Sequence, residues 1–256
     1  MLNYTDNGHG KVVVMIHGFC ESLKLWAKFE EEISKVYRVI CVDLPGFGDS
    51  HYLGEDISID WFAEQVHDLL QELNIKQYSV VGHSLGGYVC LALANKNALQ
   101  IETLTLFHST GFLDTEEKKL NRDKTVGFIE RNGVDTFMNS FVDPLFAEQN
   151  RDKCKSAIND LVIDGKRSSQ EAVIKTIVAM KNRSDRTDTL KDFGKPILLI
   201  IGEDDVAVPL VDSVKQSDMG IKTESLILKN CGHMGMIEKP TTTLTKLKEF
   251  LLNNVG

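Results

Sequence analysis

The stretch VVGHSLGGYV, residues 80–89, decides the fold and raises the first chemical question. An apolar run leads directly into Gly-His-Ser-Leu-Gly-Gly, so the hydroxyl of Ser84 stands among three glycines. A plain connection between a strand and a helix does not need so many glycines, but a sharp turn does, because glycine has no Cβ to clash with nearby backbone. The pattern G-x-S-x-G between a strand and a helix is typical of a nucleophile elbow. We therefore expect Ser84 in a strained turn with its hydroxyl exposed.

Strand-like runs alternate with helical patterns on both sides of this stretch. Nearly continuous apolar runs, such as VVVMI and ILLII, are typical of parallel strands that are covered on both faces. We expect strands over 11–16, 37–42, 78–82, 101–107, 197–201 and 224–229, and helices over 24–35, 59–73, 86–97, 210–218 and 241–253. This alternation predicts an α/β fold, a doubly wound and mostly parallel sheet with helices on both faces.

The alternation stops between residues 112 and 190. This part is helical in pattern and contains no convincing strand. We expect residues 1–111 and 191–256 to form the α/β core, and residues 112–190 to form a helical insertion, a cap or lid. Open α/β sheets bind ligands at the carboxyl edge of their strands. The insertion is therefore expected to lie over that edge.

The composition narrows the classes of partner. The net charge is −8, which argues against a nucleic acid or an anionic membrane as the main partner. The longest apolar runs have the length of strands, and the N-terminus shows no signal-peptide pattern. The five cysteines are widely spaced and form no metal-binding pattern. We expect a cytoplasmic protein with free thiols, no metal, no cofactor and a small-molecule substrate.

A serine hydroxyl is inert until a base removes its proton, and His233 is the best candidate for that base. It lies in NCGHMG, on a loop just after the last expected strand. The other histidines have plainer explanations. His83 is expected to point away from the reacting centre, and His17 and His108 are expected to be buried structural residues at strand ends.

The base needs a carboxylate that fixes its tautomer, and an acyl transfer needs donors for the oxyanion. IIGEDDVAVP follows an expected strand and offers three acidic residues, among which the residues alone leave the choice open. One oxyanion donor is expected to be the backbone N–H of Leu85, directly after Ser84. The second is expected to be the N–H of Phe19 in HGF, residues 17–19.

The chain resembles the α/β-hydrolases over nearly its full length. The order serine, acid, histidine is theirs, and so are five motifs in order and spacing: HGF at 17–19, DLPGFGDS at 43–50, GHSLGG at 82–87, GEDDVAVP at 202–209 and GHMGMIEKP at 232–240. The family's spacing in the acid motif selects Asp205, with Asp204 as the next candidate. One departure is visible. Only ten residues precede Lys11, where the family usually has an antiparallel pair of strands, so we expect one short strand at most. An edge left uncovered there could pair two chains, and a monomer and a homodimer both remain open.

The resemblance implies a serine hydrolase that cleaves a small-molecule carboxylic ester, lactone or thioester through an acyl-enzyme on Ser84, with no cofactor. A carbon–carbon bond hydrolase or a lyase of the menaquinone-synthesis type would use the same triad. Such enzymes handle anionic substrates, for which Arg122, Lys124 and Arg131 are possible clamps. A non-catalytic, hydrolase-like ligand receptor is a further alternative.

The substrate pocket is the least determined part of the site. Apolar residues in the insertion or close to the motifs could line it, or could pack the insertion against the core. The candidates are Trp26, Phe112, Phe137, Phe141 and Met234.

Overall fold

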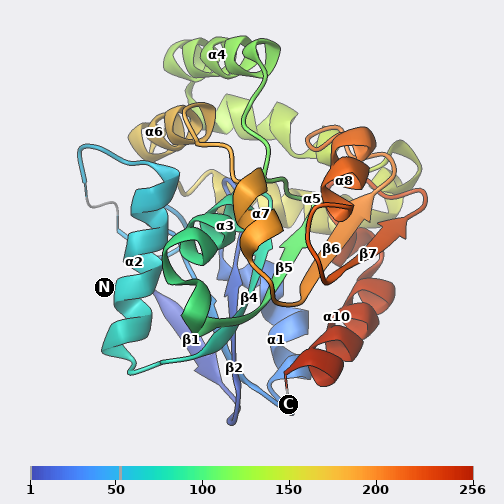
Figure 1. Ribbon diagram of the computed structural model, residues 1–256. Coiled ribbons are helices and arrows are strands. Elements are labelled where there is room, and N and C mark those ends of the chain that lie inside the picture. Colours follow the sequence, from blue (N-terminus) through green and yellow to red (C-terminus); the bar gives the residue numbers. More distant parts are fainter. Residues whose placement is uncertain (1, 52–53, 256) are drawn as a thin grey trace.

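The computed structural model describes residues 2–51 and 54–255. In this part of the chain, strands form a seven-stranded sheet in the order β1-β3-β2-β4-β5-β6-β7 (Figure 1). The strands are β1 (Tyr4–Asn7), β2 (Val12–Ile16), β3 (Arg38–Val42), β4 (Tyr78–His83), β5 (Ile101–Phe107), β6 (Ile197–Gly202) and β7 (Thr223–Leu228). Only β1 runs antiparallel to its neighbour, β3; the other described pairs are parallel. The expected mostly parallel sheet is confirmed, and β1 is the single short strand expected before Lys11.

The central strands owe their apolar sequences to burial on both faces. Every residue of β2, β4 and β6 is buried, which is why their sequences do not alternate between apolar and polar residues. At the edge of the sheet, β7 is only partly covered, and Ile227 keeps 47% of its surface exposed. Continuous apolar runs therefore mark the interior of this sheet.

Helices cover both faces, as right-handed crossovers between parallel strands require (Figure 1). One face carries α1 (Ala27–Ile33) and α10 (Pro240–Asn254), which are joined by an ion pair between Lys248 and Glu32. The other face carries α2 (Ile59–Glu72), α3 (Leu85–Asn97) and α8 (Leu210–Ser217). The short elements are η1 (Leu23–Trp26), η2 (Ala98–Gln100) and α9 (Gly235–Glu238). The helix expected over 24–35 is thus divided into η1 and α1.

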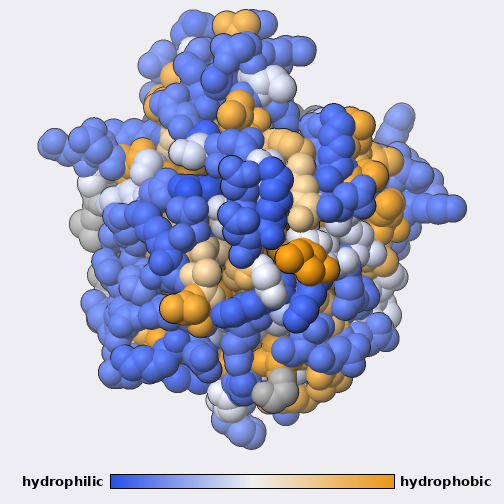
Figure 2. Space-filling model, in the orientation of Figure 1, coloured by the Kyte–Doolittle hydropathy of each residue, from blue (hydrophilic) through white to orange (hydrophobic). Residues whose placement is uncertain are grey.

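Residues 112–190 are all described and contain helices but no strand, as the sequence predicts. The helices are α4 (Glu116–Phe141), η3 (Asp143–Leu145), η4 (Glu148–Asn150), α5 (Arg151–Gly165), α6 (Gln170–Lys181) and α7 (Thr187–Asp192). In Figure 1, α4 and α6 stand apart from the sheet at the top of the molecule. On the face shown in Figure 2, the surface at the top of the molecule is mostly hydrophilic. In the described parts of the chain, no helix has both the length and the apolar character needed to cross a membrane.

A buried ion pair joins the two ends of residues 112–190, hereafter the insertion, to each other. Asp114 has no exposed side-chain surface, and its Oδ1 lies 2.7 Å from Nη1 of Arg183. Nη2 of Arg183 donates to the carbonyl oxygen of Phe112 at 2.8 Å. The same guanidinium lies 4.2 Å from the ring centroid of Tyr88 on α3. The first and last segments of the insertion are therefore held together on the surface of α3.

Candidate active site

Ser84 lies at the sharp turn between β4 and α3. Its φ of 50° and ψ of −113° place a residue with a Cβ in a region that such residues rarely adopt. The turn brings the start of α3 against the backbone of β4 and β2. A Cβ on Gly82 would lie 2.4 Å from the carbonyl carbon of Gly86, and a Cβ on Gly86 would lie 2.4 Å from the carbonyl oxygen of Ile16. Both glycines are required by close backbone contacts, as the motif predicts.

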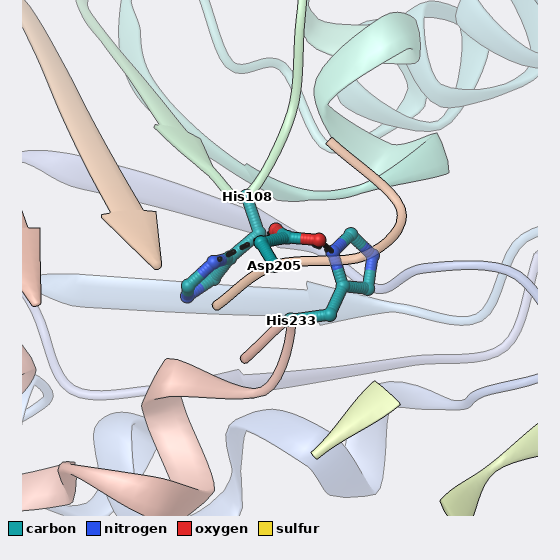
Figure 3. A group of neighbouring side chains, drawn as sticks. All are labelled: His108, Asp205 and His233. Atoms are coloured by element: carbon teal, nitrogen blue, oxygen red, sulfur yellow. Dashed lines mark hydrogen bonds and ion pairs between the residues drawn. The ribbon is translucent and has the colours of Figure 1, made fainter. Parts of the chain in front are cut away.

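His233 and Asp205 meet from two different loops. Nδ1 of His233 donates to Asp205, with distances of 2.8 Å to Oδ2 and 3.0 Å to Oδ1 (Figure 3). Both side chains are buried. Asp205 also accepts from the backbone N–H groups of Ala207 and Val208. Burial acts to raise the pKa of this carboxyl, but the adjacent His233 and His108 hold it well below its usual range. Asp205 is therefore an ionised partner of His233.

The neighbouring Asp204 has different surroundings. It is exposed, and its carboxylate accepts a hydrogen bond from Nε2 of Gln149 at 2.9 Å. Glu203 is exposed as well. Of the three consecutive acidic residues, only Asp205 faces His233.

His108 contacts the same carboxylate from the end of β5 (Figure 3). Its Nδ1 lies 3.3 Å from Oδ2 of Asp205, and its Nε2 accepts the backbone N–H of Gly235 at 3.1 Å. We therefore assign the ring proton to Nδ1, directed at Asp205. Burial lowers the pKa of His108 to about 4, so the ring is neutral at pH 7. The sequence indicated only a buried histidine at a strand end, and its contact with Asp205 was missed.

Three imidazoles are gathered at this edge of the sheet. The ring centroids of His83 and His233 are 4.8 Å apart, and those of His108 and His233 are 5.7 Å apart. The ring of His83 thus lies next to that of His233, although we expected His83 to point away from the reacting centre. The position of His108 after an expected strand places it at the carboxyl edge of the sheet, but does not show which residue it contacts there.

The backbone N–H groups of Phe19 and Leu85 donate to no protein group in the described part of the chain. Leu85 is the first residue of α3, where an N–H has no partner within the helix. The peptide before Phe19 is fixed, because Nδ1 of His17 donates to the carbonyl oxygen of Gly18 at 2.7 Å. Since the carbonyl and N–H of a trans peptide point in opposite directions, the Phe19 N–H points away from His17. Both amides are free to bind an anion.

A protein-family model described as "alpha/beta hydrolase fold" matches residues 11–240. The chain belongs to this family. It is 26% identical over 263 residues to monoacylglycerol lipase abhd6-A of Xenopus laevis, covering 95% of this chain and 76% of that protein. It is 24% identical over 261 residues to 2-hydroxy-6-oxo-6-(2'-aminophenyl)hexa-2,4-dienoic acid hydrolase of Metapseudomonas resinovorans, covering 97% of this chain and 86% of that protein. Among solved structures, a thermophilic esterase from Thermogutta terrifontis superposes with a TM-score of 0.93 at 25% identity, covering 98% of this chain and 93% of that one.

The chain is therefore a hydrolase of the alpha/beta fold. In this alpha/beta hydrolase, Ser84 and His233 share no hydrogen bond within the described residues, although each lies at the carboxyl edge of the sheet. Bonds between a nucleophile and its base are often long without substrate and tighten when it binds. The lack of a hydrogen bond between Ser84 and His233 is therefore compatible with His233 acting as the base for Ser84.

Two of the expected pocket residues lie beside the HGF loop. The rings of Phe137 and Phe141 on α4 are stacked with centroids 4.8 Å apart, and they lie 6.3 and 5.7 Å from the ring of Phe19. The structure thus brings two aromatic residues of the insertion to one expected oxyanion residue.

The other expected pocket residues are placed differently. Trp26 has no exposed surface and packs edge-on against Phe29 and Phe107 in the core. Met234 is equally buried, beside His233 in sequence. Phe112 is half-buried, at the point where its carbonyl binds Arg183. Trp26 and Phe112 are not brought to the Phe19 ring.

A hollow of about 580 Å³ lies elsewhere. It is formed between η1, α5 and α9, and none of Ser84, Asp205 and His233 lines it. Its walls are mainly apolar, with Leu25 and Met236 among them. The three residues expected to be catalytic therefore lie at the sheet edge, outside this hollow.

His108, Asp205 and His233 also form a group whose ligand atoms lie within 4.8 Å of one another, close enough to hold a metal ion. However, both Nδ1 atoms carry protons that are directed at the carboxylate, so their lone pairs are not available there. The hydrogen bond from His233 and the 3.3 Å contact from His108 fit a carboxylate that lies between two imidazoles.

Proposed function

We propose that this chain is a serine hydrolase that cleaves a small-molecule carboxylic ester, lactone or thioester. The observation that carries the proposal is the buried hydrogen bond between Asp205 and His233 at the sheet edge that also holds the strained Ser84. A carboxylate on Nδ1 leaves Nε2 of the histidine free to accept a proton. Ser84 is the nucleophile, His233 the base and Asp205 the residue that orients the base.

The reaction proceeds in two halves. In the first, Nε2 of His233 takes the proton of the Ser84 hydroxyl while Oγ attacks the carbonyl carbon. The oxyanion binds the N–H groups of Phe19 and Leu85, and the leaving alcohol departs with the proton from His233. In the second half, His233 takes a proton from water, which attacks the acyl-enzyme, and the acid is released as Oγ recovers its proton.

A carbon–carbon hydrolase or lyase would use the same catalytic groups. The alternatives therefore differ in the side chains that the insertion offers to the substrate, cationic or apolar. Arg122, one of the cations expected as a clamp, is bonded to the buried carboxylate of Asp114. Lys124 and Arg131 are exposed. Phe137 and Phe141 instead present apolar rings near Phe19. This balance of apolar contact over free cations supports an uncharged ester. It also supports residues 112–190 as the cap of the substrate site.

The test is a rate series with p-nitrophenyl acetate, butyrate, octanoate and laurate, measured for the wild type and for Ser84→Ala. We expect wild-type hydrolysis that is fastest for the short chains, because the aromatic rings of α4 close over Phe19. Ser84→Ala should lose about 10⁵- to 10⁶-fold in kcat while its circular dichroism stays that of the wild type. Turnover retained by Ser84→Ala would remove the nucleophile assignment. A folded wild type that hydrolyses no ester would favour carbon–carbon cleavage or the receptor alternative.

A further inference from the structure

A carboxylate and an imidazole that the proposed reaction does not use are buried behind the expected oxyanion loop. Glu21 is 7% exposed and His83 has no exposed surface. Oε2 of Glu21 lies 2.9 Å from Nδ1 of His83. The two residues join the HGF loop to the turn that carries Ser84.

Both ring nitrogens of His83 face hydrogen-bond acceptors. Nδ1 faces the Glu21 carboxylate, and Nε2 lies 3.0 Å from the backbone carbonyl oxygen of His233. A carbonyl oxygen can only accept, so Nε2 must carry a proton. An ionised carboxylate also only accepts, so if Glu21 is ionised, Nδ1 carries the second proton and the ring is an imidazolium.

The surroundings of Glu21 favour the ionised form of the pair over a neutral one. The backbone N–H of Gly18 donates to the same Oε2 at 2.6 Å, a short distance that is typical of a charged acceptor. Burial acts to raise the pKa of Glu21, but His83 and His17 lower it to a net value below the usual range. Burial acts to lower the pKa of His83, but Glu21 raises it to a net value above the usual range. Asp205, His108 and His233 are the other titratable groups that face His83.

The pair also explains why residue 18 is a glycine. A Cβ there would lie 2.7 Å from both Oε2 of Glu21 and Nδ1 of His83. The N–H of Gly18 is held by Glu21 and its carbonyl by His17. Both polar groups of Gly18 are therefore fixed, and the next amide, the N–H of Phe19, takes its direction from them.

We propose that Glu21 and His83 form a buried ion pair that positions two parts of the site at once, the Phe19 amide through Gly18 and the His233 backbone through its carbonyl. The inference rests on the proposed function. Neither residue touches the reacting atoms, so both are positioning residues. Because the Phe19 amide matters most when negative charge develops on the substrate, removing the pair should lower kcat more than it raises KM.

The charge of the pair is tested without reference to activity. In ¹⁵N-labelled protein at pH 8, the ring nitrogens of His83 should both retain their protons and give imidazolium-type shifts, assigned by their loss in His83→Gln. Glu21→Gln should shift that ring to the neutral form, with one protonated nitrogen. A neutral His83 ring in the wild type at pH 8 would overturn the ion pair.

The positioning role is tested by kinetics with Glu21→Gln, whose Oε1 can still accept from Gly18. Glu31→Gln, at an exposed position on α1, is the matched control. We expect Glu21→Gln to lose about 10- to 100-fold in kcat for p-nitrophenyl butyrate with KM within about twofold, which is less than the loss of a whole oxyanion donor. The inhibition constant of a trifluoromethyl ketone, which forms a tetrahedral adduct, should rise by the same factor.

The outcomes separate the two proposals. If Ser84→Ala is inactive while Glu21→Gln matches Glu31→Gln in kcat and inhibition, the positioning role is wrong and the proposed function stands. If Ser84→Ala stays active, the proposed function is wrong, and the NMR result still decides the charge of the pair. An equal rise in KM for Glu21→Gln would show that the pair supports binding and not the transition state.

Discussion

The loops at the carboxyl edge of the sheet and the helical insertion are built on different principles. In the loops, the ionisable side chains of the site are buried and each binds a specific partner on another segment: His17, Glu21, His83, His108, Asp205 and His233. In the insertion, most ion pairs are exposed, such as Lys119 with Glu116 and Lys181 with Asp123. Exposed pairs contribute little stability. The loops therefore depend on particular residues, and most of the insertion depends on its apolar pattern.

The largest effect that this comparison predicts concerns two adjacent carboxylates. Asp205→Asn should lower kcat by about 10⁴-fold, because the amide favours the wrong tautomer of His233. Asp204→Asn is the matched control, because Asp204 is exposed and bonded to Gln149. It should stay within about twofold of the wild type, since changes at exposed positions are usually small. Steady-state kinetics with p-nitrophenyl butyrate measures both, and a large loss confined to Asp204→Asn would reverse the assignment.

The insertion contains one exception to its pattern, the buried pair of Asp114 and Arg183. Asp114→Asn should lower the free energy of unfolding by about 3 to 5 kcal/mol, because Arg183 would stay buried without a charged partner. Asp123→Asn, which removes the exposed pair with Lys181, should change it by less than about 0.5 kcal/mol. Urea unfolding at pH 7 compares the two variants.

The same pair has a defined pH dependence. Burial acts to raise the pKa of Asp114, but Arg122 and Arg183 hold it below the usual value. A carboxyl with a depressed pKa stabilises the folded state fully above its unfolded pKa of about 3.9, and loses this contribution as pH falls through the folded value. The difference between the wild type and Asp114→Asn should therefore be constant from pH 7 to 5 and shrink below about pH 4. A constant difference down to pH 3 would contradict the ionised pair.

Glycine-to-alanine changes compare the two regions directly. A Cβ at Gly86 would meet the carbonyl oxygens of Ile16 and His17 at 2.4 and 2.6 Å, and backbone atoms there cannot move aside. Gly86→Ala should lower the free energy of unfolding by about 2 to 3 kcal/mol. On α4, a Cβ at Gly127 would meet only the end of the flexible Arg131 side chain, at 3.3 Å. Gly127→Ala should raise it by about 0.5 to 1 kcal/mol, because alanine favours helices. Equal losses in urea unfolding would mean that the elbow is not specially constrained.

The sequence predicts the elements and the elbow because their signals are local. Apolar runs mark buried strands, and the glycines around Ser84 mark a turn whose close contacts are observed. Asp205 could be preferred over Asp204 only by the spacing of a known family. The orientation that separates them depends on where the loop after β6 meets His233.

The roles of Glu21 and His108 could not be predicted in the same way. Glu21 binds His83, 62 residues further along the chain, because β2 and β4 are neighbours in the sheet. His108 reaches Asp205 because β5 and β6 are neighbours. Each contact requires the strand order, which a single sequence does not reveal. Buried polar pairs between distant segments are therefore the part of the site that depends on the three-dimensional fold.

The smallest expected effect concerns the aromatic contact between the insertion and the HGF loop. Phe137→Leu removes a ring that stacks on Phe141 and lies 6.3 Å from the ring of Phe19. If this ring lines the acyl site, KM for p-nitrophenyl butyrate should rise about threefold with kcat nearly unchanged, because roughly 0.7 kcal/mol of apolar contact is lost equally in ground and transition states. Phe128→Leu, at a half-buried position on the same helix, is the control and should leave KM unchanged. Equal KM values for both variants would assign Phe137 to packing alone, and the insertion would then contribute stability to the site without contacting the acyl chain at this residue.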